Sequence, residues 1–207
     1  MSLTMPILEE LQLYSINKCP FESFEKWFEE ALTKEENPSA FSLATATNNA
    51  VPSVRFLLFK GLQNYKFNFF TNKTSPKSQD LSKNPYAAMA FYWHKTGRQV
   101  RISGKVEEMN REMVEDYCSK RPRLSQVATY VSKQGQKLKS KNELIESFNQ
   151  CLESFEGKNI PTPNHWTGYS VIPHEIEFFI YGEHRLNDRF LFEKKESESW
   201  EISRLAP

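Results

Sequence analysis

The chain has 207 residues, of which 39% are hydrophobic and 14% aromatic, so it is long enough to bury one sizeable core. The formal net charge of +1 argues against a general nucleic-acid binder. Cys19, Cys118 and Cys151 are widely spaced and form no CxxC pair, which favours a reducing, cytoplasmic location over a disulfide framework.

We expect an N-terminal arm over residues 1–20 and a single domain over 21–207. The first residues include acidic side chains and lack a basic start followed by an apolar run, so they do not resemble a signal peptide. No apolar stretch approaches the roughly 18 residues that a membrane helix needs, so no membrane partner is expected.

The first predicted element is an amphipathic helix over 23–34, with Ser23 as its N-cap and an end at Asn37-Pro38. A block rich in β-formers follows, with meander strands over 41–47, 53–60 and 65–71. The next two strands, 87–93 and 98–109, should pair around Thr96-Gly97, and alternation in the second predicts one buried and one polar face.

Between these blocks, Ser75-Pro76 predicts the start of a short helix over 75–84. Asn110 can cap a helix over 111–119, and an apolar stripe marks a longer helix over 141–156. The last strands are expected at 167–172, 175–181, 189–193 and 200–204. Many short hairpin strands must hide their edges, so the fold class is α+β, a closed or nearly closed and mostly antiparallel β-barrel with peripheral helices.

Familiar catalytic signatures are missing from the chain. There is no GxSxG, HExxH, P-loop or GxGxxG sequence, and the histidines lack metal-ligand spacing, so no metal site is expected. What the chain offers instead is cationic and amide side chains on strands or at their ends, and each group also has an ordinary structural explanation.

Arg55 and Lys60 share one strand segment, but their odd separation puts them on opposite faces unless the strand bulges or Lys60 lies past its end. For this pair alone, an ordinary strand with polar ends is the favoured explanation. The segment 69–78 leads into a helix N-terminus, where free N–H groups and the helix dipole favour a phosphate. Lys77 in that first turn is unfavourable unless an anion is present, which favours a functional interpretation over a simple capped helix.

Three further groups carry the same chemistry. Gln99 lies on the polar face of its strand, where it could bind a ring edge or face solvent. The segment 117–126 places Arg121 and Arg123 on either side of Pro122. This pattern fits either a phosphate clamp or a solvated basic loop. If 182–190 is extended, Arg185, Asn187 and Arg189 share a face, as a ligand site or as a charged hairpin rim. Together the groups predict several anion sites on a small barrel, and therefore a phosphorylated ligand.

In this order the segments resemble the pyridoxine 5′-phosphate oxidase family. The resemblance rests on RFLLFKG, FFTNKTSPK, FYWHKTGRQVRISG, SKRPRLSQVATYVSKQ, HWTGY, IEFF, HRLNDRF and a closing RLAP, and it runs from about residue 20 to the C-terminus. It implies an FMN-binding split barrel that forms homodimers, with two FMN sites built from both subunits. The implied reaction oxidises pyridoxine or pyridoxamine 5′-phosphate to pyridoxal 5′-phosphate with O2 and releases H2O2.

The resemblance also implies roles for single residues. The implied FMN contacts are Arg55, Phe56, Lys60, Phe70, Thr71, Lys77, Gln99, Gln134, Phe179 and Arg189. The implied substrate contacts are Lys60, Tyr117, Arg121, Ser125, Arg185 and Asn187, and of these Arg185 and Asn187 stand at the catalytic positions.

The chain departs from the family pattern at four of its motifs. Pro76 replaces an Arg, Gly135 replaces a Ser, Phe179 replaces a Trp, and Asn187 replaces a His that contacts the substrate. Asn cannot act as a near-neutral acid or base. We therefore expect any divergence from the family to concern the substrate and the chemistry. A sister FMN oxidase of the phenazine-pathway type is therefore the alternative function, and a non-catalytic flavin-binding protein is a third.

Overall fold

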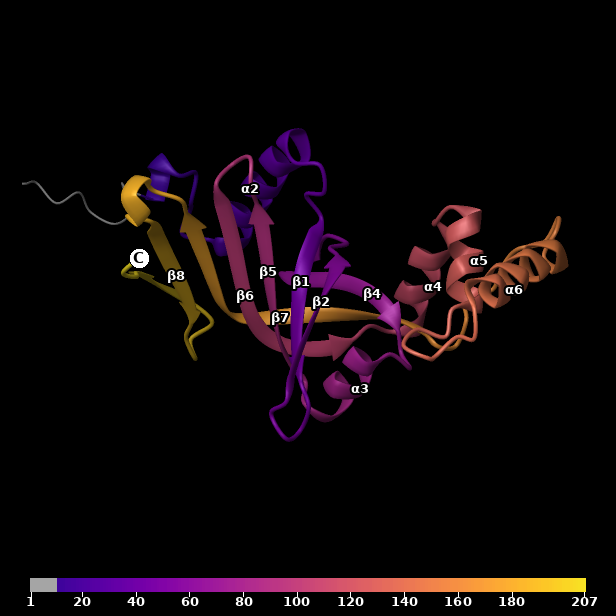
Figure 1. The fold of residues 1–207 in the computed structure, drawn as a ribbon. Coiled ribbons are helices and arrows are strands. Elements are labelled where there is room, and N and C mark those ends of the chain that lie inside the picture. Colours follow the sequence, from indigo (N-terminus) through magenta and orange to yellow (C-terminus); the bar gives the residue numbers. More distant parts are fainter. Residues whose placement is uncertain (1–10) are drawn as a thin grey trace, which may run out of the picture.

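The computed structural model describes residues 11–207. Figure 1 shows a curved sheet with helices at its ends and sides. Its elements are α2 (Pro20–Lys34), β1 (Ala40–Ala46), β2 (Pro52–Leu58), β3 (Leu62–Gln63), β4 (Lys66–Asn72), α3 (Pro76–Lys83), β5 (Tyr86–Trp93), β6 (Arg98–Glu108), α4 (Arg111–Ser119), α5 (Arg123–Val131), α6 (Lys141–Ser154), β7 (Trp166–Ile180), the 3-10 turn η1 (Glu183–Arg185), β8 (Asp188–Lys194) and β9 (Trp200–Arg204).

The strands form one antiparallel sheet in the order β2-β1-β5-β6-β7-β4-β3, and β8 joins β7 to β9. Strand β7 pairs with β6 along nearly its whole length, while on its other side β4 takes the first half and β8 the second. This division opens the sheet into two branches and confirms the predicted α+β split barrel. The barrel closes where Lys60 N–H donates to Asn68 O at 2.8 Å, just beyond the end of β2.

An aromatic core fills the barrel. Helix α2 inserts Phe24 and Trp27, which are almost fully buried. The Phe24 ring meets Phe67 and Phe91 edge-on with centroids at 4.8 and 5.1 Å, and Trp27 meets Phe178 at 5.0 Å. A smaller apolar cluster lies between α5 and α6. The many Phe residues of the sequence therefore hold the barrel together from one side of the sheet.

The N-terminal arm predicted over 1–20 is described only from residue 11, and its first ten residues lie outside the described part of the chain. Within the described part, Leu11 and Ile16 are buried in the barrel core. Tyr14 accepts a hydrogen bond from the Trp27 indole N–H at 2.8 Å through its carbonyl oxygen. These residues pack on the barrel that follows them.

Three expectations about local structure were wrong. Helix α2 begins at Pro20 with Cys19 as N-cap, and Ser23 is a buried helical residue that donates to the Cys19 carbonyl. Strand β4 does not continue a meander, because closure of the barrel pairs it with β7. The strands expected at 167–172 and 175–181 are one strand, because the β6 partner shifts register at Ser103/Gly104 and accommodates Pro173.

The condition under which Arg185, Asn187 and Arg189 would share a face is not met, because 182–190 is not extended throughout. Residues Glu183–Arg185 form a 3-10 turn in which His184 and Arg185 have positive φ of 56° and 65°. In addition, Arg123–Val131 is a helix that the sequence analysis did not predict. Within 11–207, no helix is long and apolar enough to cross a membrane.

Candidate functional site

A pocket of polar side chains forms where β4 runs into α3. Lys77 lies in the first turn of α3, and only 5% of it is exposed. Its Nζ contacts Thr71 Oγ1 and Gln134 Oε1 at 3.0 Å each and Ser75 Oγ at 3.1 Å. Ser75-Pro76 begins the helix as predicted, and this start turns the ammonium group inward. Residues from β4, α3 and the segment after α5 thus meet at one point, which we call the anion pocket (Thr71, Ser75, Lys77, Gln134).

The charge of this pocket is not balanced within the described residues. Burial, together with a smaller contribution from the nearby positive charge of Arg55, lowers the pKa of Lys77 to about 8. Arg55 donates to Leu43 O at 3.1 Å and to Thr45 Oγ1 at 2.8 Å. Burial lowers the pKa of Arg55, while the charge of Asp80 acts in the opposite direction. In the described part of the chain, Lys77 contacts only neutral acceptors, so the pocket is suited to an anion from outside the chain.

Two of the departures from the family pattern touch each other at this pocket. Gly135 has a φ of +87°, which favours glycine, and a Cβ placed on it would lie 2.9 Å from Cδ of Pro76. The proline ring therefore occupies the space that a side chain at position 135 would need. The losses of Arg at 76 and of Ser at 135 are linked by this contact, and Lys77 and Arg55 are left as the nearby cations.

A second group lies beside α4. The rings of Phe70 and Tyr117 are stacked with centroids 3.7 Å apart and planes at 6°. Together with Lys60 they line a cavity of about 340 Å³. Lys60 lies past the end of β2, so the alternation of side chains along that strand does not force it onto the face opposite Arg55.

Arg121 lies between α4 and α5 near this group. Its guanidinium lies 5.0 Å from the Trp166 ring centre and donates to Thr129 Oγ1. Ser125 lies in the first turn of α5, the helix that the sequence analysis missed. A solvated basic loop is therefore wrong for residues 123–126, because they begin a helix that packs on α6.

A third group is a row of side chains across three strands. Gln99 of β6 is directly opposite Phe179 of β7, and Phe179 is directly opposite Arg189 of β8. Cross-strand partners point to the same face of a sheet, so these three residues form a row, which we call the flavin-face row. Phe179 is buried, and Tyr181 meets it edge-on at 5.3 Å.

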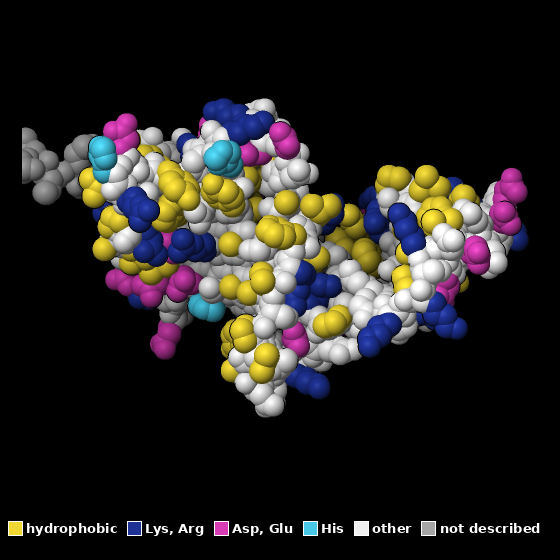
Figure 2. All heavy atoms as spheres, in the orientation of Figure 1, with side chains coloured by type: hydrophobic (Ala, Val, Ile, Leu, Met, Phe, Trp, Pro, Cys, Tyr) yellow, Lys and Arg dark blue, Asp and Glu magenta, His cyan; other side chains and the backbone are white. Residues whose placement is uncertain are grey.

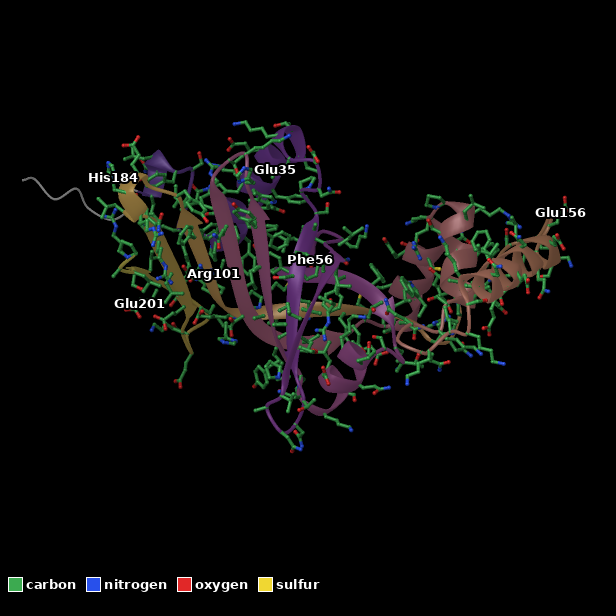
Figure 3. The ribbon with its side chains drawn as sticks, in the orientation of Figure 1. Glu35, Phe56, Arg101, Glu156, His184 and Glu201 are labelled. Atoms are coloured by element: carbon green, nitrogen blue, oxygen red, sulfur yellow. The ribbon has the colours of Figure 1, made fainter. Side chains whose placement is uncertain are left out.

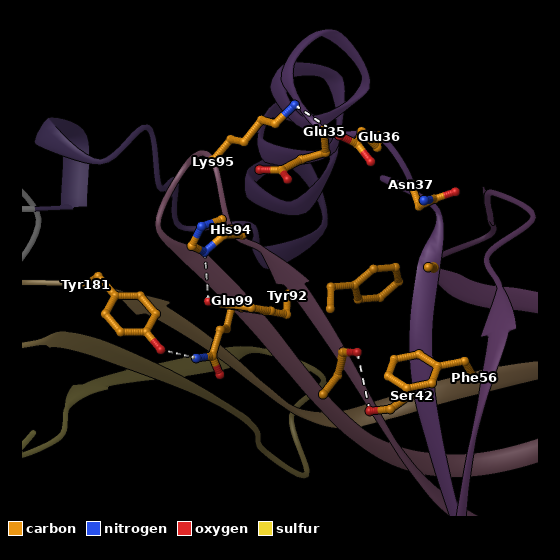
Figure 4. A pocket seen from close by; sticks show the side chains of 13 residues that line it. Glu35, Glu36, Asn37, Ser42, Phe56, Tyr92, His94, Lys95, Gln99 and Tyr181 are labelled. Carbon is orange, nitrogen blue, oxygen red and sulfur yellow. Dashed lines mark hydrogen bonds and ion pairs between the residues drawn. The ribbon is translucent and has the colours of Figure 1, made fainter.

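A cavity of about 720 Å³ adjoins this row. Figure 4 shows Gln99, Tyr181 and Tyr92 on one side of it and Phe56 on the other. The Gln99 amide donates to Tyr181 Oη at 3.5 Å. Phe56 is 79% exposed on β2 and does not pack on the row within the chain.

Arg185 and Asn187 belong to the loop between β7 and β8. Asn187 Oδ1 accepts a hydrogen bond from Gly182 N–H at 3.2 Å and so ties the two ends of the loop together. A Cβ on Gly182 would lie 2.0 Å from Leu186 O, so the loop needs glycine there. In this chain, Asn187 therefore has a structural use that does not involve proton transfer.

The predicted site residues do not all meet within one chain. Arg55, Thr71, Lys77 and Gln134 come together as one cluster, and Lys60, Phe70 and Tyr117 as another. The loop that carries Arg185 and Asn187 lies at the opposite end of the molecule from α4 and α5, as Figures 1 and 3 show, with His184 labelled at that end. A single site that contains both Tyr117 and Arg185 needs a second copy of the chain.

The outer face of β2 is apolar and uncovered. Val54, Phe56 and Leu58 alternate along it with exposed fractions of 69%, 79% and 53%. Figure 2 shows hydrophobic side chains gathered over this part of the sheet. A contiguous exposed apolar strand face is typical of a protein interface.

Two residues that the sequence analysis did not select, Glu177 and Arg101, contact the flavin-face row. Glu177 of β7 is buried and forms ion pairs with Arg101 and Arg189. The signal was present as an acidic residue between the apolar neighbours Ile176 and Phe178, but its partners are close only after β6, β7 and β8 have paired.

Comparison with known proteins gives consistent matches over the chain. Residues 28–150 match the family described as pyridoxamine 5′-phosphate oxidase, and residues 166–207 match the pyridoxine 5′-phosphate oxidase C-terminal dimerisation region. A relative from Trichormus variabilis, named pyridoxine/pyridoxamine 5′-phosphate oxidase, is 39% identical over 97% of this chain and 94% of its own. One of the same name from Aliarcobacter butzleri is 40% identical over 95% and 93%.

Among solved structures, PhzG from Burkholderia lata in complex with tetrahydrophenazine-1-carboxylic acid is 25% identical, with a TM-score of 0.88 over 100% of this chain and 98% of its own. A pyridoxamine 5′-phosphate oxidase-related, FMN binding protein from Nostoc punctiforme is 15% identical, with a TM-score of 0.75 over 91% and 98%. The second similarity concerns the fold alone.

Proposed function

Because the chain belongs to the pyridoxine/pyridoxamine 5′-phosphate oxidase family, we propose that it is an FMN-dependent oxidase that converts pyridoxamine or pyridoxine 5′-phosphate to pyridoxal 5′-phosphate. The observation that carries the proposal is the buried Lys77 ammonium, which has only neutral partners among the described residues. Its donor set fits the phosphate of FMN, since an anion there would pair with the buried Lys77 ammonium.

FMN, when bound, supplies a two-electron acceptor that dioxygen can reoxidise with release of H2O2. The residues of the chain bind and orient. Lys77, Arg55, Thr71 and Gln134 hold the flavin phosphate, and the row of Gln99, Phe179 and Arg189 contacts the ring. Phe56 and Phe70 complete the flavin contacts.

For the substrate, Arg121 supplies a planar fork of donors that matches phosphate oxygens. Lys60 and Tyr117 line one cavity, and with Ser125 of α5 they complete the proposed phosphate site. Arg185 orients the pyridine ring where hydride leaves, and Asn187 fixes the loop that carries it.

We further propose that the working enzyme is a homodimer in the cytoplasm. The substrate-phosphate group and the Arg185 loop lie at opposite ends of one chain, so a second copy must complete each site. The exposed apolar face of β2 and the match of residues 166–207 to a dimerisation region support this assembly. The cytoplasmic location is proposed from the three cysteines alone, which are free in the structure.

A second candidate is a sister oxidase that acts on a reduced phenazine precursor. The fold similarity to PhzG and the departures at Phe179 and Asn187 favour it. The retained Tyr117, Arg121 and Ser125 favour a phosphorylated pyridine instead. A flavin-binding protein without catalysis is the third candidate, and the retained Arg185 argues against it.

A substrate panel separates these functions. The FMN-loaded protein is mixed with pyridoxamine 5′-phosphate, pyridoxamine and a dihydrophenazine carboxylate, and H2O2 release is measured. We expect turnover of the phosphorylated pyridine above the other two. Turnover of the phenazine compound alone would replace the proposal with the second candidate, and no turnover with any compound would favour the third.

The variant Arg121→Ala tests the phosphate role within the same assay. We expect KM for pyridoxamine 5′-phosphate to rise roughly ten- to hundredfold, the equivalent of about 1.5–3 kcal/mol for a hydrogen bond to a charged group. Unphosphorylated pyridoxamine is the matched control, because its KM should not change. An equal loss with both compounds would refute the phosphate role.

A further inference from the structure

A buried carboxylate, that of Glu177, lies beside the flavin-face row on β7. Only 7% of the Glu177 side chain is exposed. Its Oε1 accepts from Arg189 Nε at 2.7 Å and its Oε2 from Arg101 Nη1 at 3.3 Å. One carboxylate on β7 thus joins a cation on β8 to a cation on β6, and it raises the pKa of Arg189.

The strand register puts this network beside the row. Glu177 is directly opposite Arg101, and two residues further along β7, Phe179 is opposite Gln99 and Arg189. Side chains two residues apart on a strand point to the same face, so the carboxylate and the row share one face of the sheet.

The network also contacts each member of the row. Glu177 binds Arg189 directly. Arg101 Nη2 donates to Gln99 Oε1 at 3.4 Å, and its guanidinium carbon lies 5.4 Å from the centre of the Phe179 ring. Glu177 is thus joined to Arg189 directly and to Gln99 and Phe179 through Arg101.

We propose that Glu177 is a positioning residue that, with Arg101, orients the flavin-face row and sets the local charge there. This inference rests on the proposed function, since it assumes that the row faces FMN. Neither residue is needed to explain the barrel core, which lies on the other face of the strands. A buried ion pair is by itself weak evidence for stability, so a functional reason for keeping this one is consistent with its cost.

The charge effect has a definite sign. Arg101 and Arg189 carry two positive charges and Glu177 one negative charge, which leaves a net charge of +1. Replacement of the carboxylate by an amide leaves +2. A flavin gains negative charge on reduction, so added positive charge nearby favours its reduced form. Glu177 therefore keeps the reduction potential of the bound flavin lower than the two arginines alone would set it.

The test compares four variants by the midpoint potential of bound FMN and by FMN affinity. Glu177→Gln keeps the shape and one acceptor, and we expect a shift to a more positive potential. Arg101→Gln should shift it to a more negative value, and the double variant should return towards wild type. Glu175→Gln is the matched control, because Glu175 lies two residues earlier on β7 and has no ion pair among the described residues.

Two controls separate the possible failures. Thermal unfolding of the FMN-free variants shows whether Glu177→Gln still folds, and Arg101→Gln is the fallback because its side chain is 43% exposed. If wild type binds FMN but both variants keep its potential and its affinity, the inference is wrong and the proposed function stands. If wild type does not bind FMN, the proposed function fails first.

Discussion

Lys77 gives the sharpest prediction, because its pKa in the FMN-free protein lies within the range of ordinary buffers. Its pKa is lowered from 10.5 to about 8, mainly by burial. Between these two pH values the folded protein binds fewer protons than the unfolded chain. The cost of burying the ammonium is therefore fully present below pH 8 and disappears as the pH rises to 10.5.

The magnitude follows from the shift. At about 1.36 kcal/mol per pKa unit, the cost of the buried charge is on the order of 3 kcal/mol in the FMN-free protein. A phosphate dianion beside the ammonium raises its pKa again, so FMN binding above pH 8 must take up a proton. We expect the dissociation constant of FMN to be flat from pH 7 to 8 and then to rise by up to about tenfold per pH unit.

Fluorescence titration of the FMN-free protein with FMN measures this directly, and riboflavin, which lacks the phosphate, is the ligand control. Lys77→Met should weaken FMN by about 1.5–3 kcal/mol and abolish the pH dependence, while leaving riboflavin unchanged. Lys83→Met at the exposed end of α3 is the matched control. Equal pH profiles for FMN and riboflavin in wild type, or an unchanged FMN profile in Lys77→Met, would refute the phosphate site.

Three further predictions follow from single contacts. Asn187→His should make the rate depend more steeply on pH near neutrality than the wild-type rate does, because a titrating group enters the loop; identical pH profiles would show that Asn187 does not alter the chemistry. Phe56→Asp should shift the protein towards monomers in light scattering at micromolar concentration, and an unchanged mass would exclude β2 from the interface. Gly135→Ser should destabilise the fold by about 1–3 kcal/mol in denaturant unfolding, and Pro76→Arg in the same chain should recover part of the loss; additive losses would disprove their coupling.

Elements governed by local patterns could be predicted from the sequence. The pairing of β5 with β6 follows from alternation around Thr96-Gly97, and Val100 and Ile102 are buried as that alternation requires. Asn110 accepts from Met113 N–H at 2.9 Å and caps α4 as expected. In these cases the residues that determine the local structure are close together in the sequence.

Elements governed by distant contacts could not be predicted. A helix from Arg123 is unremarkable in isolation, and packing of α5 on α6 decides it. The loop over 182–187 depends on two residues with positive φ and on the bond from Gly182 to Asn187, which no periodicity reveals. The pairing of β4 with β7 is set by closure of the barrel rather than by chain order.

The same distinction applies to the site. Lys77 was recognisable because a cation at a helix N-terminus is locally unfavourable. Its partner Gln134 was identified from the resemblance alone, since 57 residues separate the two. Glu177 and Arg101 were missed because charged residues on a strand are usually solvated, and only the register shows that they face each other.

Anaerobic mixing of the FMN-loaded protein with pyridoxamine 5′-phosphate tests the central claim most directly. The account predicts that the flavin absorbance bleaches within a single turnover and returns when dioxygen is admitted, and that unphosphorylated pyridoxamine at the same concentration bleaches it far more slowly. An FMN-loaded protein whose absorbance does not change with pyridoxamine 5′-phosphate would contradict the account.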